Sequence, residues 1–293
     1  MTNTEFEKIL AKSAAEFEEY FKSYFDFDDT DLSAVGDAMR YSSLGGGKRI
    51  RPFIVAEVCR MLGGDVESVM PLAAALECVH TYSLIHDDLP CMDNDDFRRG
   101  RPTCHKVYGE EFALLAGDGL LTYAFEVIAK APLLNDKAKV EAVRLLSSLA
   151  GLYGMVGGQT IDLQSEGTEI SMDKLLKLHA LKTGALIRCA AQFGALGADE
   201  AVKSDINEYA KNIGLAFQIA DDILDVTADE NELGKPVGSD KENGKVTFLS
   251  FMSLEEAKEY ARELTSSAKK LMEKYKNSEV LMCLADYIVE RKK

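Results

Sequence analysis

Apolar residues recur at helical spacing from residue 5 to the C-terminus of this 293-residue chain, and runs with strand-like alternation are scarce. This periodicity restricts the chain to an all-α fold. Glycine-rich segments interrupt the pattern, but no repeat and no Pro/Ser linker divides it. We therefore predict a single domain, 1–293, of about ten helices. Their expected ranges are 4–25, 30–42, 49–62, 66–89, 110–131, 136–158, 172–198, 202–227, 254–275 and 278–291.

Composition limits the compartment and the partners of the chain. Apolar residues make up 46% of the sequence, which is ample for a large core. A formal net charge of -15, with no long basic stripe, argues against nucleic acid or an anionic membrane as a partner. The six cysteines form no CxxC pair, the N-terminus lacks a targeting pattern, and no apolar run approaches the roughly 18 residues of a membrane span. We expect a cytoplasmic protein with reduced thiols.

An aspartate-rich stretch in the first third of the chain carries the strongest chemical signal. Five carboxylates lie within ten residues, from Asp87 to Asp96, and repel one another unless a cation neutralises them. Hard oxygen ligands of this kind suit Mg2+ that is held partly through a substrate phosphate. Arg98 and Arg99 follow at once, and paired guanidinium groups bind phosphate oxygens bidentately. The stretch therefore predicts a site for a metal-bound diphosphate.

A second acidic motif, Asp221-Asp222-Ile223-Leu224-Asp225, repeats the carboxylate theme far downstream. Alone it is a weak pattern, because acidic helix faces are commonly only solvated. The neighbouring segment 214–220 and residues 223–224 are mostly apolar, which indicates that these carboxylates emerge from a core face. We therefore expect them to line a cavity.

Helical spacing aligns each motif with one face of its helix. If the two helices pack side by side, their carboxylates face each other across the mouth of a cavity with apolar lower walls. The two predicted faces are Leu76, His80, Ser83 and Asp87, and Gly214, Gln218, Asp221 and Asp225.

Asp93 does not fit the first face in a regular helix, because six residues place it about 120° away from Asp87. Pro90 can remove this mismatch by interrupting the helix. It lacks an N–H and clashes with the preceding turn, so the helix should bulge or end near Leu89. Asp93 can then return toward Asp87.

Small basic islands provide candidate anion sites, although single Lys and Arg residues are commonly just solvated. The segment 45–48, Gly-Gly-Gly-Lys, is similar to a phosphate loop, but Arg49 stands where a P-loop needs Ser or Thr. A flexible turn that ends in solvated basic residues fits the segment equally well. The stretch 93–100 fails the EF-hand pattern at Phe97 and Gly100. His86, His105 and His179 show no partner at metal-ligand spacing, and we interpret them as structural.

Taken together, these motifs resemble the trans-isoprenyl diphosphate synthases, in particular the bacterial farnesyl diphosphate synthases. The matching features are both aspartate motifs, the Gly-Gly-Lys-Arg-x-Arg-Pro run at 46–52, Lys-Thr-Gly-Ala at 182–185 and the later Gly-Lys segments. The resemblance covers nearly the whole chain from Tyr41 onward. It implies helices around a central active-site cavity, a homodimer, and three Mg2+ ions per site, with Mn2+ as a substitute.

Position by position, the resemblance also implies roles for individual residues. Asp87, Asp88 and Asp93 resemble the first metal site, and Asp221, Asp222 and Asp225 the second. Lys48, Arg51, His80 and Arg99 resemble the isopentenyl diphosphate pocket. Arg98, Lys182, Lys235 and Lys245 resemble the clamp on the allylic diphosphate, and Thr183 and Gln218 the dipoles that steady the cation near the reacting carbon.

The expected reaction joins isopentenyl diphosphate to dimethylallyl and then geranyl diphosphate. Ionisation of the allylic diphosphate leaves a carbocation, the double bond of isopentenyl diphosphate attacks it, and the departing diphosphate takes the proton. Three alternatives remain: a synthase of twenty-carbon or longer chains, a terpene cyclase, and an inactive helical partner subunit. The cyclase would not need Lys48, Arg51 and Arg99, and the inactive partner would be free to lose its carboxylates.

Product length should depend on residues about one turn before Asp87. Tyr82 and Ser83 lie roughly 6–7.5 Å below it along the helix at 1.5 Å per residue. The Tyr82 ring, together with the bulge at Pro90-Cys91, is expected to stop growth at fifteen carbons. If Tyr82 instead packs sideways into the core, the floor lies deeper and the product has twenty carbons.

Overall fold

The computed structural model of the protein describes residues 1–27, 29–227 and 246–291 and confirms the all-α prediction. The α-helices of these ranges are α1 (Asn3–Lys22), α2 (Ser33–Ser43), α3 (Ile50–Met61), α4 (Val66–Asp87), α5 (Cys104–Tyr108), α6 (Glu110–Ala129), α7 (Asp136–Ala150), α8 (Met155–Leu163), α9 (Met172–Lys182), α10 (Gly184–Gly194), α11 (Glu200–Thr227), α14 (Leu254–Met272) and α15 (Glu279–Glu290). Short 3-10 turns lie at Ser23–Phe25, Thr30–Leu32 and Phe248–Ser250, and a two-stranded hairpin joins β1 (Phe97–Arg98) to β2 (Arg101–Pro102).

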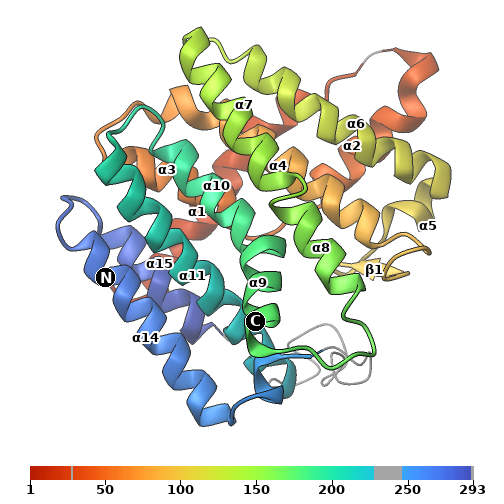
Figure 1. Ribbon diagram of the computed structural model, residues 1–293. Coiled ribbons are helices and arrows are strands. Elements are labelled where there is room, and N and C mark those ends of the chain that lie inside the picture. The colour runs from red at the N-terminus through yellow and green to blue at the C-terminus, as the bar shows by residue number, and fades with distance from the viewer. Residues whose placement is uncertain (28, 228–245, 292–293) are drawn as a thin grey trace.

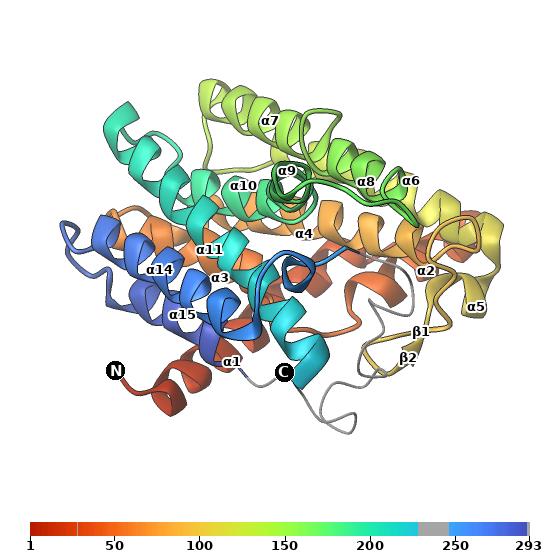
Figure 2. The ribbon, with the colours of Figure 1, turned by 60° about the horizontal axis from the view of Figure 1, so that its bottom comes forward.

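Helix α4 is the centre of the arrangement, with α3, α6 and α10 packed around it (Figure 1). Residues 71–79 of α4 are all buried, as expected for a helix that is apolar on every side. In Figure 2, α7 and α8 lie above α4, and α3, α14 and α15 lie below it. The first aspartate motif therefore stands at the end of a helix whose middle turns are enclosed by its neighbours.

Two predicted helices are each divided in the structure. The predicted helix 136–158 becomes α7 and α8, with a turn between them at residues 151–154. Gly154 permits this turn, because a Cβ there would lie 2.0 Å from the carbonyl oxygen of Leu149. The predicted helix 172–198 becomes α9 and α10, which meet at Thr183 and Gly184. The second break ends α9 directly after Lys182.

The hairpin and α5 were not predicted, because both are too short for periodicity to reveal. Arg99 and Gly100 are the two central residues of the hairpin turn, and both have positive φ, 54° and 73°. Two left-handed residues match the twist of the flanking strands in a two-residue turn. The turn separates the directions of the adjacent guanidinium groups of Arg98 and Arg99.

Helices α4 and α6 are long and apolar enough, by composition alone, to cross a membrane. The apolar window of α4 is 72% buried inside the protein, which is typical of a core helix. That of α6 is only 39% buried. Three large apolar side chains on the outside of α6, those of Phe112, Leu114 and Leu115, are 41%, 48% and 50% exposed.

Candidate active site

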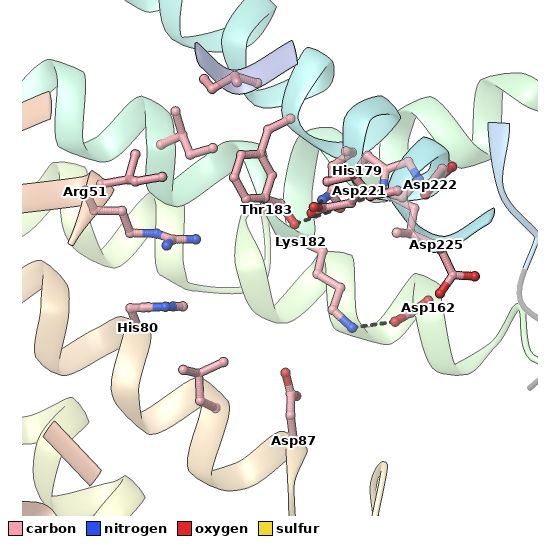
Figure 3. Close-up of a pocket in the computed structure, with 18 of the residues that line it drawn as sticks. Arg51, His80, Asp87, Asp162, His179, Lys182, Thr183, Asp221, Asp222 and Asp225 are labelled. Carbon is pink, nitrogen blue, oxygen red and sulfur yellow. Dashed lines mark hydrogen bonds and ion pairs between the residues drawn. The ribbon is translucent and has the colours of Figure 1, made fainter. Parts of the chain in front are cut away.

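A cavity of about 910 Å3 opens between the ends of α4, α9 and α11. Its walls combine acidic, basic and apolar side chains that lie far apart in the sequence, and Figure 3 shows a part of them. The sequence-predicted residues among its lining are Lys48, Arg51, His80, Asp87, Asp93, Arg98, Arg99, Lys182, Thr183, Gln218, Asp221, Asp222 and Asp225.

The first motif reaches the cavity because α4 ends at Asp87, ahead of Pro90. The chain then folds back, and the backbone N–H of Asp93 donates to the carbonyl oxygen of Asp87 at 2.8 Å. Both carboxylates consequently line the cavity, as expected from the effect of Pro90. Burial raises the pKa of Asp87 to about 6; the charge of Asp93 adds to this shift, and that of Lys182 opposes it.

Asp88 does not share this position. Its carboxylate is turned away from the cavity lining and is buried against Arg98, whose Nε donates to both carboxylate oxygens at 2.7 and 2.9 Å. The structure therefore separates Asp88 from the other predicted metal ligands. Asp88 instead fixes the guanidinium of Arg98, which does line the cavity.

The second motif lines the opposite wall, and Figure 3 shows Asp221, Asp222 and Asp225 across the cavity from Asp87. Asp222 and Asp225 are buried, and one oxygen of Asp222 accepts the backbone N–H of Phe248 at 2.7 Å. Asp221 accepts from Nη2 of Arg291 at 2.5 Å. These contacts fix the motif at the cavity wall.

The donor chemistry of the two motifs fits Mg2+, since all the groups are hard carboxylate oxygens. Among the residues that the structure describes, however, no three His, Cys, Asp or Glu side chains are close enough to hold an ion. Mg2+ bound here therefore needs ligands beyond those that the described residues supply, and the oxygens of a diphosphate between the two walls are suitable.

Lys182, Thr183 and Gln218 meet between the two acidic walls. Nζ of Lys182 donates to Asp162 at 2.5 Å (Figure 3). The hydroxyl of Thr183 donates to Oε1 of Gln218 at 3.0 Å, and Nε2 of Gln218 donates to Asp221 at 3.3 Å. The amide of Gln218 thus has a fixed orientation.

Glycine brings the backbone of α8 against Lys182. A Cβ at Gly158 would lie 2.2 Å from the backbone nitrogen of Lys182, so only glycine allows α8 to come this close. This contact positions the end of α9, and with it Lys182 and Thr183.

Sequence reasoning missed three residues of this region. His179 was interpreted as structural, yet it lines the cavity, and its Nδ1 lies 3.0 Å from Oε1 of Gln218, an acceptor, so Nδ1 carries the proton. Its position one turn before Lys182 on the same helix was an available signal. Asp162 and Arg291 also line the cavity, and no local pattern distinguished them. His86 and His105 lie outside the lining, bonded to Leu114 and Thr103.

The other end of the cavity is basic, because the loop 45–49 (the basic loop), the first turn of α3 and the hairpin bring together Lys48, Arg51 and Arg99. Nζ of Lys48 lies 5.4 Å from the centre of the Tyr287 ring, and Arg99 donates to the carbonyl of Gly46. Burial, followed by the charges of Arg51 and Arg99, lowers the pKa of His80 well below its ordinary value. His80 is therefore a neutral hydrogen-bonding group beside three cations.

The predicted face of α4 is rotated in the structure. Glu77, His80, Leu84 and Asp87 line the cavity, whereas Leu76 is fully buried in the core and Ser83 lies outside the lining. Tyr82 also lies outside it, with its ring packed edge-on against His86 at 5.7 Å. Gly117 of α6 makes room for that imidazole, because a Cβ there would lie 2.0 Å from Nε2 of His86.

On α11, Gly214 lies at the contact with Gly184 of α10 and not in the lining. Two lysines predicted for the allylic clamp, Lys235 and Lys245, lie outside the described residues.

An all-α fold whose central cavity carries aspartates from two helices opposite a basic end defines a class of enzymes that act on prenyl diphosphates. A model of the polyprenyl synthetase family matches residues 33–287, and the chain belongs to that family. It is a trans-prenyl synthase.

Individual relatives confirm the resemblance inferred from the motifs. The chain is 46% identical over 268 residues to the farnesyl diphosphate synthase of Escherichia coli K12, covering 88% of this chain and 90% of that protein. It is 44% identical over 268 residues to the large subunit 1 of the heterodimeric geranylgeranyl pyrophosphate synthase of Arabidopsis thaliana, covering 88% and 72%. The crystal structure of geranylgeranyl pyrophosphate synthetase from Pyrococcus horikoshii superimposes with a TM-score of 0.89 at 31% identity, covering 98% and 99%.

Proposed function

We propose that the protein is a farnesyl diphosphate synthase. It condenses isopentenyl diphosphate head-to-tail with dimethylallyl and then geranyl diphosphate, and releases diphosphate at each step. The observation that supports the proposal is the distribution of charge in one cavity: carboxylates from α4 and α11 lie at one end, and Lys48, Arg51 and Arg99 lie at the other. We assign one diphosphate to each end. A single-substrate enzyme would need only one of these ends.

The residues of the acidic end bind and orient the allylic diphosphate. Arg98, held by Asp88, and Lys182, held by Asp162, present cations to its oxygens. Three Mg2+ ions carried by Asp87, Asp93 and the second motif would neutralise the charge that develops on the leaving diphosphate. Such electrostatic stabilisation is usually the largest contribution to catalysis.

The residues between the two ends handle the carbocation and the incoming double bond. When the allylic C–O bond breaks, the hydroxyl of Thr183 and the amide of Gln218 lie in the lining with dipoles of fixed direction. Apolar side chains such as Ile187, Ile213 and Phe217 exclude water from the cation. The double bond of isopentenyl diphosphate attacks, a new C–C bond forms, and the released diphosphate accepts the proton that is lost.

The basic end binds isopentenyl diphosphate through Lys48, Arg51, Arg99 and the neutral His80. A site in which cations predominate suits this substrate, because its C–O bond remains intact during the reaction and needs no metal to ionise it. The two diphosphates are thus distinguished by the groups that surround them.

Fifteen carbons is the product length that we propose, on the basis of the ring of Tyr82 one turn below Asp87 and the likeness to bacterial farnesyl diphosphate synthases. A twenty-carbon product is the second candidate. It is favoured by the relatives named as geranylgeranyl synthases and by the position of Tyr82 outside the cavity lining.

We further propose that this single catalytic domain works as a homodimer that pairs through α6. The exposed apolar side chains of Phe112, Leu114 and Leu115 support this interface. The helix also packs directly on α4, so that an interface there would lie one helix away from the first aspartate motif.

Radiolabelled isopentenyl diphosphate tests the proposal when it is incubated with Mg2+ and with each allylic primer in turn, followed by chromatography of the product. A fifteen-carbon product from the dimethylallyl and geranyl primers is expected. A main product of twenty carbons would establish the second candidate. No incorporation with any primer would identify the chain as an inactive partner subunit.

A further inference from the structure

Arg49 stands between Lys48 and Arg51 and also belongs to the cavity lining, but its guanidinium is held by acceptors from neighbouring helices. It has a φ of 48°, in the left-handed region, and its side chain is only 1% exposed. The guanidinium donates to Glu18 of α1 at 2.5 and 2.8 Å, to Glu77 of α4 at 2.6 Å, and to the carbonyl of Ser43 in α2 at 2.5 Å. Arg49 therefore ties the basic loop to three helices.

Glu77 is the counter-ion in this network that reaches the cavity. Its side chain is 3% exposed, and it lies in the lining one turn before His80. Burial lowers the pKa of both Arg51 and Arg99, and the carboxylate of Glu77 opposes the shift in each case. Glu77 thus acts electrostatically on the two arginines of the basic end as well as on Arg49.

We propose that Glu77 and Arg49 form a buried ion pair that positions the basic loop and sets the net charge of the pocket for isopentenyl diphosphate. This inference rests on the proposed function of that pocket. Arg49 and Glu77 are positioning residues: they act through Lys48, Arg51 and Arg99, which contact the diphosphate.

The physical reason is the repulsion among clustered cations in an empty, poorly solvated pocket. Glu77 offsets this repulsion when no diphosphate is present, and Arg49 prevents the carboxylate from swinging into the pocket and pairing with the arginines there. The balance between the charge of Glu77 and the charges of the arginines also limits the affinity of the pocket for a diphosphate. After each coupling step the new allylic diphosphate must leave the basic end, and an additional uncompensated positive charge would hold it there.

Substitution of each partner should change the affinity for isopentenyl diphosphate in opposite directions. Glu77→Gln keeps an oxygen that accepts from Arg49 but removes one negative charge, so the dissociation constant should fall about fivefold. Arg49→Met keeps the length of the side chain but leaves Glu77 uncompensated, so the constant should rise tenfold or more. In the double variant, the dissociation constant should return to within about threefold of the wild-type value.

Calorimetric titration of the full chain with isopentenyl diphosphate, in EDTA and without an allylic primer, measures this constant without turnover. Glu57→Gln is the matched control, since it removes the carboxylate of an Arg60 ion pair on α3 outside the cavity lining. Glu57→Gln should leave the dissociation constant within about twofold of the wild-type value. Thermal denaturation of each variant shows whether it is folded.

The result distinguishes a charge-setting pair from one that only stabilises the fold, because a purely structural pair would weaken binding in both single variants. Unchanged or weaker binding by Glu77→Gln overturns the inference. If Glu77→Gln does not fold, the double variant decides the question. The inference is overturned if the double variant binds isopentenyl diphosphate as weakly as Arg49→Met does, or if the double variant also fails to fold. Failure of the proposed function is distinct, since wild-type protein would then neither bind nor incorporate isopentenyl diphosphate.

Discussion

At the scale of single residues, the site consists of charged groups that hold one another in place before any substrate is present. Asp88 fixes Arg98, Asp162 pairs with Lys182, and Asp221 accepts from Arg291. Sequence alone identified most of the charged groups that line the cavity, because motifs preserve their order and spacing. It could not identify Asp162 or Arg291, because their roles depend on which helix ends meet in space.

The carboxylates that line the cavity should matter far more for turnover than for binding of isopentenyl diphosphate, because in the proposed mechanism they act on the ionising group. We expect Asp87→Ala and Asp221→Ala each to reduce kcat by more than a hundredfold, about 2.7 kcal/mol. Asp95→Ala is the control, as it removes a carboxylate of the same loop that lies outside the lining. Steady-state kinetics with both substrates varied measure these effects. A kcat within tenfold of the wild-type value for the Asp87 and Asp221 variants would contradict the two-motif mechanism.

Because of His179, the free energy of unfolding should vary with pH in the mildly acidic range. Burial lowers its pKa to about 4 from an ordinary 6.5, against the opposing hydrogen bond to Gln218. Between these values the unfolded chain binds more protons, so the contribution is fully present above pH 6.5 and is lost as the pH falls toward 4. We expect the free energy of unfolding to fall more steeply over this range in the wild type than in His179→Phe, which keeps the ring stacked on Phe248. Parallel slopes in urea denaturation series would refute this.

At the scale of elements, periodicity placed the helices well but not all of their ends. The breaks after α7 and α9 were missed because the apolar spacing continues through them, while the backbone turns where Gly154 and Gly184 allow close contacts. The face of α4 was predicted one position away from the observed one, since both Leu76 and Glu77 fit helical spacing with His80. Packing of Leu76 into the core decided between them.

The contact between α8 and α9 gives an element-scale prediction. Alanine normally stabilises a helix relative to glycine by about 0.5–1 kcal/mol. At Gly158 we expect the opposite sign, because the added Cβ would strike the backbone of Lys182. Gly158→Ala should lower both the melting temperature and kcat. Gly119→Ala, where the added Cβ would meet only the flexible side chain of Met39, should be tolerated; equal melting temperatures for the two variants would show that α9 is not positioned by this contact.

The packing of α4 on α6 gives a prediction about product length. The Tyr82 ring lies against His86, toward the glycine of α6 that makes room for the imidazole. We expect Tyr82→Ala to shift the main product to twenty or more carbons, because the space that the ring now fills, just outside the lining, would extend the cavity below Asp87. Tyr108→Ala, in α5, is a control that should leave the product unchanged. Chromatography that shows an unaltered fifteen-carbon product from Tyr82→Ala would mean that another residue sets the length.

At the scale of the whole molecule, the homodimer proposed to pair through α6 can be tested by mutation. A charged residue among the exposed apolar side chains of α6 would oppose burial of this face. We expect Leu115→Glu to convert a dimer to a monomer in light scattering, with little change in the stability of the monomer, because Leu115 is half exposed. Val226→Glu, at a similarly exposed position on α11, should leave the mass unchanged. A wild-type protein that is already monomeric would remove the basis for the interface.

The stacking of Arg291 on Phe217 has a practical consequence for spectroscopy. The guanidinium carbon lies 3.8 Å from the ring centre, inside the cavity lining, and the chain contains no tryptophan. Phe217→Trp would therefore introduce the sole indole of the protein beneath a cation, against a background with no other indole emission. Its fluorescence would report directly, without any product assay, whether that arginine leaves the ring when a diphosphate enters.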